Sequence, residues 1–170
     1  MYRVSIQINF DIMDVLKISC GADLAPIECI NPRRDRWAVR WDLHQEQDGA
    51  WFASEVVVDH RPTVDEIRGI ISRHIDAITQ DEIINGFSWK GKPVRLTDDA
   101  QRNFLFAVYS LDRTGEIDRA QFVGLLEAQT DAEAADELGD MVAAIWQHIK
   151  QKRADGIAAK NAVDFSKYVL

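Results

Sequence analysis

The stretch from residue 86 to residue 104, GFSWKGKPVRLTDDAQRNF, constrains the fold more than any other part of the chain. Gly86 predicts the end of a helix, because glycine readily adopts the left-handed conformation that often follows one. Lys90-Gly91 predicts the turn of a short hairpin, with Phe87, Ser88 and Trp89 as its first arm and Val94, Arg95 and Leu96 as its return arm. Pro93 has no N–H to donate, which places the return arm at a sheet edge or in a two-stranded flap. Thr97 is expected to cap a second helix. The stretch therefore predicts helix, hairpin and helix in succession.

The first 60 residues alternate apolar and polar side chains, as half-buried strands do. We expect a strand at residues 2–10, a second at 15–20 paired with the first, and two more at 37–43 and 51–58. Residues 21–35 contain prolines and a cluster of arginines and are expected to form a loop without regular structure. The sequence therefore predicts a four-stranded antiparallel sheet, arranged as a meander.

Three tryptophans, Trp37, Trp41 and Trp51, lie in the hairpin expected from the last two strands. Trp37 and Trp41 should share a face with Val39 and Leu43. Aromatic side chains at alternate strand positions commonly build a core or an interface, which is the interpretation that we favour. A surface that stacks on a glycan is the alternative, although no acidic pair beside the tryptophans indicates hydrolysis.

Two capping boxes, each a threonine with a glutamate three positions later, predict helix starts at Thr63 and Thr130. The first helix carries an apolar stripe to Ile78, and a separate shorter turn is expected between it and the hairpin. The second helix is expected to run from residue 131 to about residue 154, with Gly156 as its end.

The chain ends in Phe165, Tyr168 and Leu170, which are too apolar for a free terminus and should dock on protein. The candidate interface residues are therefore Trp37, Trp41, Trp51, Phe165, Tyr168 and Leu170. We expect an α+β fold with two domains. Residues 1–60 form an antiparallel sheet module, and residues 61–170 form a mostly helical module that contains the hairpin at 86–96.

The anchoring stretch also carries a longer pattern, GFxWxGxxVxL[TS]xxxQxN[FY]. Its positions are occupied by Gly86, Phe87, Trp89, Gly91, Val94, Leu96, Thr97, Gln101, Asn103 and Phe104. In this pattern the chain resembles a domain family of unknown function that occurs in phage and prophage genomes, often beside tail-fibre and tail-assembly genes. The resemblance covers roughly the last 110 residues, a length typical of one small domain. It implies a phage-tail setting, and no catalytic activity is attached to the family.

Composition and motifs exclude several function classes. A formal charge of −8 argues against a nucleic-acid binder, because that affinity depends on neutralising phosphates with clustered Lys and Arg. The two small basic groups, Arg33-Arg34-Arg36 and Lys150-Lys152-Arg153, are interpreted as a solvated loop and a complement to a helix C-terminus. No stretch approaches the roughly 20 apolar residues of a membrane helix, and the N-terminus does not read as a signal peptide. We therefore expect synthesis in the bacterial cytoplasm. Cys20 and Cys29 lack a metal-ligand spacing and are expected to be ordinary thiols.

Motifs for chemistry are also missing. The sequence has no GxSxG, HExxH, Walker loop or dinucleotide fingerprint, so we expect no catalytic site and no cofactor. The segment SLDRTGEIDRAQF fits a calcium loop at Gly115 and Ile117, but Ser110 and Gln121 stand where calcium needs carboxylates. We interpret it as a surface turn. His74 lies beside the apolar stripe of the first helix, and we expect it at the edge of the core, with no metal bound.

These observations favour a structural or interaction component of a bacteriophage tail, located in the virion in the fibre, baseplate or connector region. Its expected partners are other tail proteins and copies of itself, with no nucleic acid and no membrane. An assembly chaperone that binds the tail fibre and leaves before maturation is the alternative, and a glycan-binding module is a third hypothesis.

Overall fold

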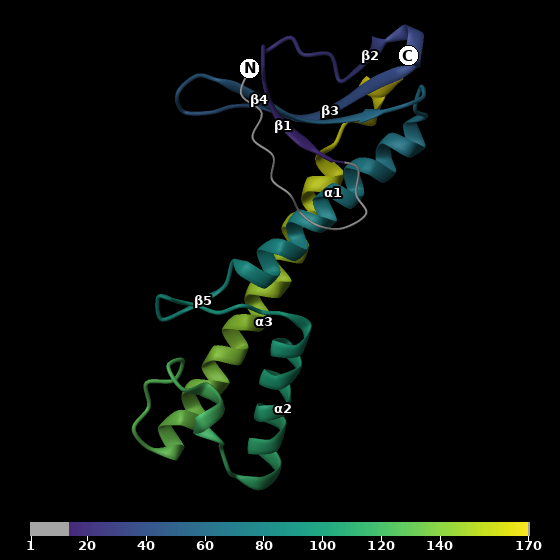
Figure 1. Ribbon diagram of the computed structural model, residues 1–170. Helices are drawn as coiled ribbons and strands as arrows, with labels where there is room; N and C mark the ends of the chain where they lie inside the picture. The colour runs from purple at the N-terminus through teal and green to yellow at the C-terminus, as the bar shows by residue number, and fades with distance from the viewer. Residues whose placement is uncertain (1–13, 170) are drawn as a thin grey trace. The chain divides into compact units, whose positions relative to one another are not determined.

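The structure is a computed structural model that describes residues 14–169 (Figure 1). A four-stranded antiparallel sheet comes first, followed by helices with a two-stranded hairpin between them. This confirms the predicted α+β class. The strand predicted at residues 2–10, and its pairing with the next strand, lie outside the described residues.

The described residues form two compact units. The first unit runs to Ile75 and resumes at Ala159, and the second runs from Asp76 to Ala158. Two helices, α1 (Val64–Asn85) and α3 (Asp131–Ala162), therefore contribute residues to both units. The predicted division at residue 60 is wrong, because the start of α1 and the end of the chain pack with the sheet.

The sheet of the first unit consists of β1 (Leu16–Cys20), β2 (Ile27–Asn31), β3 (Arg36–Gln45) and β4 (Trp51–Val58). Its strand order is β1-β4-β3-β2. The last three strands form a meander, whereas β1 pairs with β4 and not with its neighbour in sequence. Of the predicted meander, only the pairing of the strands at 37–43 and 51–58, which are β3 and β4, is correct, because β2 was not predicted as a strand. Much of β4 is buried, and flanking strands on both of its edges give its backbone groups hydrogen-bond partners.

Strand β2 lies inside the segment predicted to be a loop. Pro26 and Pro32 flank this strand, and the arginines that follow it form a one-turn 3-10 helix, Pro32–Arg34. Ile27 is 7% exposed and lies opposite Val39 of β3. The loop prediction was wrong because the two prolines mark the ends of a short edge strand, where no ladder N–H is required.

A β-bulge changes the face that Leu43 occupies. Trp41 lies opposite Ser54, but the next paired residue of β3 is His44, opposite Phe52. The strand thus holds one extra residue there, and Asp42 takes a φ of 54°. Leu43 is 40% exposed and does not share the face of Trp41. The alternation had predicted a shared face, so this prediction is wrong.

The core of the first unit lies between the sheet and the first half of α1. Its buried members are Ile27, Val39, Trp41, Val56, Val58, Ile67, Ile70, Ile71 and Tyr168. The predicted capping box starts the helix: Thr63 N donates to Glu66 Oε2 at 2.7 Å, and Glu66 N donates to Thr63 Oγ1 at 3.3 Å.

The C-terminal residues dock on this unit, as predicted. A 3-10 turn, Phe165–Tyr168, packs Phe165 and Tyr168 against the core. The Tyr168 hydroxyl donates a hydrogen bond to the Arg40 carbonyl at 2.7 Å. A buried hydroxyl with a partner fixes the chain end at one place on the sheet.

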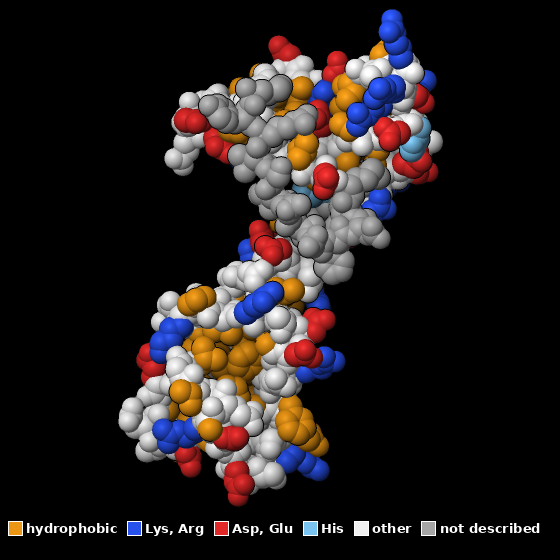
Figure 2. All heavy atoms as spheres, in the orientation of Figure 1, with side chains coloured by type: hydrophobic (Ala, Val, Ile, Leu, Met, Phe, Trp, Pro, Cys, Tyr) orange, Lys and Arg blue, Asp and Glu red, His pale blue; other side chains and the backbone are white. Residues whose placement is uncertain are grey.

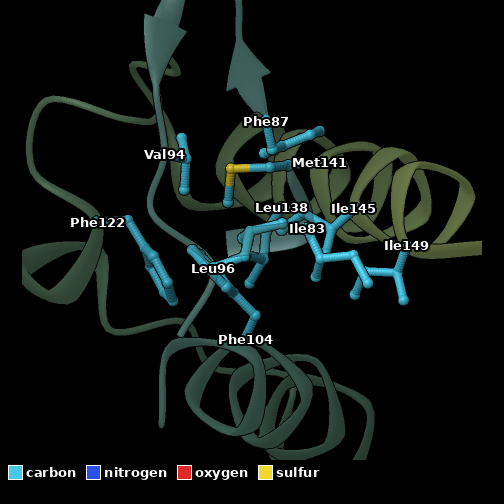
Figure 3. Packing of buried hydrophobic residues seen from close by; sticks show 10 residues of the cluster. All are labelled: Ile83, Phe87, Val94, Leu96, Phe104, Phe122, Leu138, Met141, Ile145 and Ile149. Atoms are coloured by element: carbon cyan, nitrogen blue, oxygen red, sulfur yellow. The ribbon is translucent and has the colours of Figure 1, made fainter. Parts of the chain in front are cut away.

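The second unit is built from the end of α1, the strands β5 (Ser88–Trp89) and β6 (Lys92–Pro93), the helix α2 (Asp98–Thr114), a 3-10 turn at Arg119–Phe122 and most of α3. Its buried core gathers side chains from all these helices and from the segments beside the hairpin (Figure 3). These side chains are Ile83, Phe87, Val94, Leu96, Phe104, Phe122, Leu138, Met141, Ile145 and Ile149.

Helix α1 is continuous to Asn85, so the separate turn predicted at residues 80–85 is wrong. Gly86 donates its N–H to Glu82 O at 2.9 Å, and its φ is not in the left-handed region. The predicted reason for this glycine is therefore also wrong. A Cβ here would lie 2.5 Å from Glu82 O, so the position requires glycine for space.

Helix α3 begins with the predicted capping box but does not end at Gly156. Gly156 is buried within the helix, where a Cβ would approach Thr79 of α1, with Thr79 Cγ2 at 3.2 Å. The glycine allows α1 and α3 to come close within the second unit. Gly156 had been predicted to end the helix, but it is instead the residue that lets the two helices pack closely.

Candidate protein interaction site

The hairpin turn at Lys90-Gly91 is formed as predicted, but the return strand is Lys92–Pro93. The predicted return arm of Val94, Arg95 and Leu96 is therefore wrong, because Val94 and Leu96 are buried in the core of the second unit. Lys90 and Gly91 both take positive φ, 47° and 79°, as the type I′ turn of a two-residue hairpin requires. Trp89 lies opposite Lys92, and Pro93 occupies the short return strand. The turn thereby presents the Trp89 ring and the Lys90 ammonium to α3.

Glu137 of α3 binds this turn and the segment that precedes the helix. Its Oε1 accepts from Lys90 Nζ at 2.7 Å and from Trp89 Nε1 at 3.3 Å. Its Oε2 accepts the backbone N–H groups of Glu127 and Ala128 at 2.9 and 3.0 Å. One carboxylate thus fixes the hairpin and the 127–128 segment to the same turn of α3.

These contacts lower the pKa of the Glu137 carboxyl to about 2. The hydrogen bond from Lys90 contributes most, and burial opposes the shift because it disfavours the charged form. The Glu137 side chain is 10% exposed, and every hydrogen bond named above belongs to the second unit. Glu137, Lys90 and Trp89, which we call the Glu137 cluster, hold the second unit together, and we assign this cluster no substrate.

Most other residues of the pattern from Gly86 to Phe104 also serve the fold. Phe87, Val94, Leu96 and Phe104 are buried in the core of the second unit. Thr97 caps α2 by accepting from Ala100 N at 3.2 Å, as predicted. Gln101 Nε2 donates to Leu96 O at 2.8 Å, whereas Asn103 is exposed. The pattern therefore describes how this unit is built.

The predicted interface residues of the first unit divide between core and surface. Trp41 and Tyr168 are 7% and 6% exposed and are not available to another molecule. Trp37, Trp51 and Phe165 are half-buried, and Leu170 lies outside the described residues. Arg61 lies over the Trp37 ring and Arg68 over the Phe165 ring, so these two rings already have partners within the chain.

The outer face of α2 is the largest apolar feature that sequence reasoning missed. Leu105, Phe106 and Tyr109 are 63%, 71% and 60% exposed, and we call these three residues the α2 stripe. Figure 2 shows hydrophobic side chains gathered over this helix. Arg113 lies beside the stripe, with its Cζ 6.0 Å from the centre of the Tyr109 ring.

The reason for the stripe lies in the run FLFAVY at residues 104–109. A helix turns 100° per residue, so six consecutive apolar residues cannot all face one core. Phe104 is buried and Val108 packs against the core, which leaves the stripe on the opposite side of α2. The length of this run was the signal for a second apolar face.

Other exposed apolar residues of the second unit, such as Val123, Trp146 and Ile157, lie outside α2: Val123 follows the 3-10 turn at Arg119–Phe122, and the other two lie apart on α3. Such scattered residues are normal on protein surfaces. His74 is half-buried against the edge of the Trp41 ring, as expected, and burial lowers its pKa. Between residues 14 and 169, no group of three or more His, Cys, Asp and Glu side chains is placed to hold a metal ion.

Comparisons of the chain with protein families, with curated proteins and with solved structures find no match. None of the helices in the described part of the chain is long and apolar enough to cross a membrane. The exposed apolar side chains of the α2 stripe are therefore the candidate protein interaction site.

Proposed function

We propose that this chain is a structural component of a bacteriophage tail, in the fibre, baseplate or connector region, and that it acts through protein–protein contacts. The tail setting rests on the resemblance carried by the pattern from Gly86 to Phe104. The mode of action rests on one observation, the exposed α2 stripe. Contiguous apolar side chains on an otherwise charged surface mark sites where another protein binds.

The arrangement of the second unit supports this mode of action. The core behind α2 is closed by Phe104, Leu96 and their neighbours, and the Glu137 cluster holds the hairpin and α3 in place. A rigid support beneath an exposed apolar face lowers the entropic cost of binding. The stripe is therefore presented by a preorganised helix.

Quantitative mass spectrometry of purified phage particles tests the tail assignment. Particles of a phage that encodes the chain are expected to contain it in a fixed ratio to a known tail protein, and a non-virion protein from the same lysate serves as the negative control. A chain that is absent from the particles but bound to unassembled tail fibres would support the chaperone alternative and contradict a virion component.

A further inference from the structure

The α2 stripe lies in the middle of a longer surface whose two ends are charged. Positions 98, 102, 105, 109 and 112 follow the spacing of four and three residues that places side chains along one side of a helix. Asp98 and Arg102 precede the stripe, and Asp112 follows it, all three exposed. This face is amphipathic along its length, with an apolar centre between opposite charges.

We propose that two copies of the chain associate through the α2 stripe, with their α2 helices antiparallel about a two-fold axis at the level of Ala107. In that register Leu105 of one copy lies opposite Tyr109 of the other, because the two residues are equally far from Ala107. For the same reason Arg102 of one copy lies opposite Asp112 of the other, twice. The surface is thus complementary to itself, as a two-fold interface must be.

Charge selects this arrangement over a parallel one. A parallel pair would place Arg102 beside Arg102 and Asp112 beside Asp112, and like charges across an interface disfavour binding. Arg102 already contacts Asp99 within its own helix, but both side chains are largely exposed, at 73% and 83%. Exposed pairs of this kind contribute little, so Arg102 is able to turn to a better partner.

The apolar centre supplies the binding energy. Complete burial of a Leu or Phe side chain stabilises by about 1.5–3 kcal/mol, and each copy contributes three large side chains. A single helix pair is nevertheless a small interface, so we expect a dissociation constant on the order of micromolar. This inference deepens the proposed function and rests on its premise that the chain acts through protein–protein contacts.

Size-exclusion chromatography with light scattering on the full chain, from about 1 to 300 µM, tests the pairing. We expect the wild type to approach twice the 19.3 kDa of one chain as its concentration rises. The L105E/Y109E variant should remain a monomer over this range, with dimer affinity reduced at least 100-fold. Trp146→Glu is the matched control, since Trp146 is also 60% exposed but lies on α3. Circular dichroism verifies that each variant is folded.

The charged ends give a second test that does not alter the stripe. Arg102→Asp and Asp112→Arg should each weaken the dimer about tenfold, because each creates two like-charge pairs, and the double variant should recover most of the loss. A wild type that stays monomeric up to 300 µM overturns the proposal, as does a dimer that survives L105E/Y109E. Failure of the double charge variant to recover overturns the antiparallel register. None of these outcomes depends on whether the chain is found in virions.

Discussion

The sheet of the first unit and the outer face of α2 both carry large aromatic side chains, but only the sheet buries one of them in a core. Trp41 lies on a strand face that α1 covers and is 7% exposed, whereas Phe106 lies opposite the core of its own unit and is 71% exposed. In the sheet, the apolar residues follow the period of the strand and meet one core. On α2 they exceed the number that one face can hold, and the excess remains on the surface.

The largest expected difference lies between these two aromatic residues. Trp41→Ala should lower the free energy of unfolding by about 3–5 kcal/mol, since it leaves a cavity in the core of the first unit. Phe106→Ala should change it by less than about 0.5 kcal/mol at concentrations well below the dissociation constant of the dimer, because the side chain is 71% exposed in its own chain. Urea unfolding followed by circular dichroism measures both. Similar losses for the two variants would contradict the distinction between core and surface.

Two glycines of α3 show the same contrast between a packed and an open position: Gly156 packs against Thr79, and Gly139 has no neighbour within 4 Å of an added Cβ. Gly156→Ala should destabilise by about 2–3 kcal/mol, because its Cβ would collide with Thr79. Gly139→Ala, in the same helix with no atom within 4 Å of an added Cβ, should stabilise by up to about 1 kcal/mol. Thermal unfolding of the two variants provides the measurement. Equal effects would mean that the contact between Gly156 and Thr79 does not limit the packing of α1 and α3.

Acid titration tests the Glu137 cluster, which joins the hairpin and the 127–128 segment to α3. The Glu137 pKa is about 2 in the folded chain against an ordinary value of 4.5, so its stabilisation is complete above about pH 4.5 and is lost as the pH falls towards 2. We expect about 2 kcal/mol from this group. Glu137→Gln should be less stable than the wild type at neutral pH, with the difference shrinking in acid.

Glu116→Gln, at an exposed position of the same unit, is the control for that titration and should follow the wild type. A Glu137→Gln variant whose deficit stays constant from pH 6 to pH 2.5 would show that the carboxylate is not stabilised by its charge.

The smallest expected effect concerns the docked chain end. Tyr168→Phe removes the hydrogen bond to the Arg40 carbonyl and should cost about 1 kcal/mol. Burial raises the pKa of the Tyr168 phenol to about 12 from 10.0, with a further contribution from Asp164. The stabilisation by the neutral phenol is therefore present below pH 10 and lost as the pH rises towards 12. Chemical unfolding at pH 8 and pH 11 measures this, and an unchanged Tyr168→Phe variant at pH 8 would argue against the contact.

The sequence predicts those parts of the fold in which a local signal has one structural solution. The capping box at Thr63, the hairpin turn at Lys90-Gly91 and the Thr97 cap are all formed, because each depends on a few neighbouring residues. The docked Tyr168 also follows from a simple rule, that an apolar chain end seeks burial.

Other features of the fold depend on contacts between residues far apart in the sequence, which local sequence signals do not specify. Pro32 reads as a loop signal, although it ends the edge strand β2, and Gly156 reads as a helix end, although it lies where α3 meets α1. The pairing of β1 with β4 is equally invisible to periodicity, which does not state which strands are neighbours. The α2 stripe needed a count of apolar residues against helical geometry, and only the structure shows that, among residues 14–169, its side chains are left exposed.

Hydroxyl-radical footprinting of the full chain at about 1 µM and about 200 µM tests the central claim, that the α2 stripe is a contact surface and Trp41 of the sheet is core. The account predicts that Leu105, Phe106 and Tyr109 are oxidised readily in the dilute sample and become protected at high concentration, while Trp146 stays reactive and Trp41 stays protected in both. Equal oxidation of the stripe at the two concentrations would contradict it.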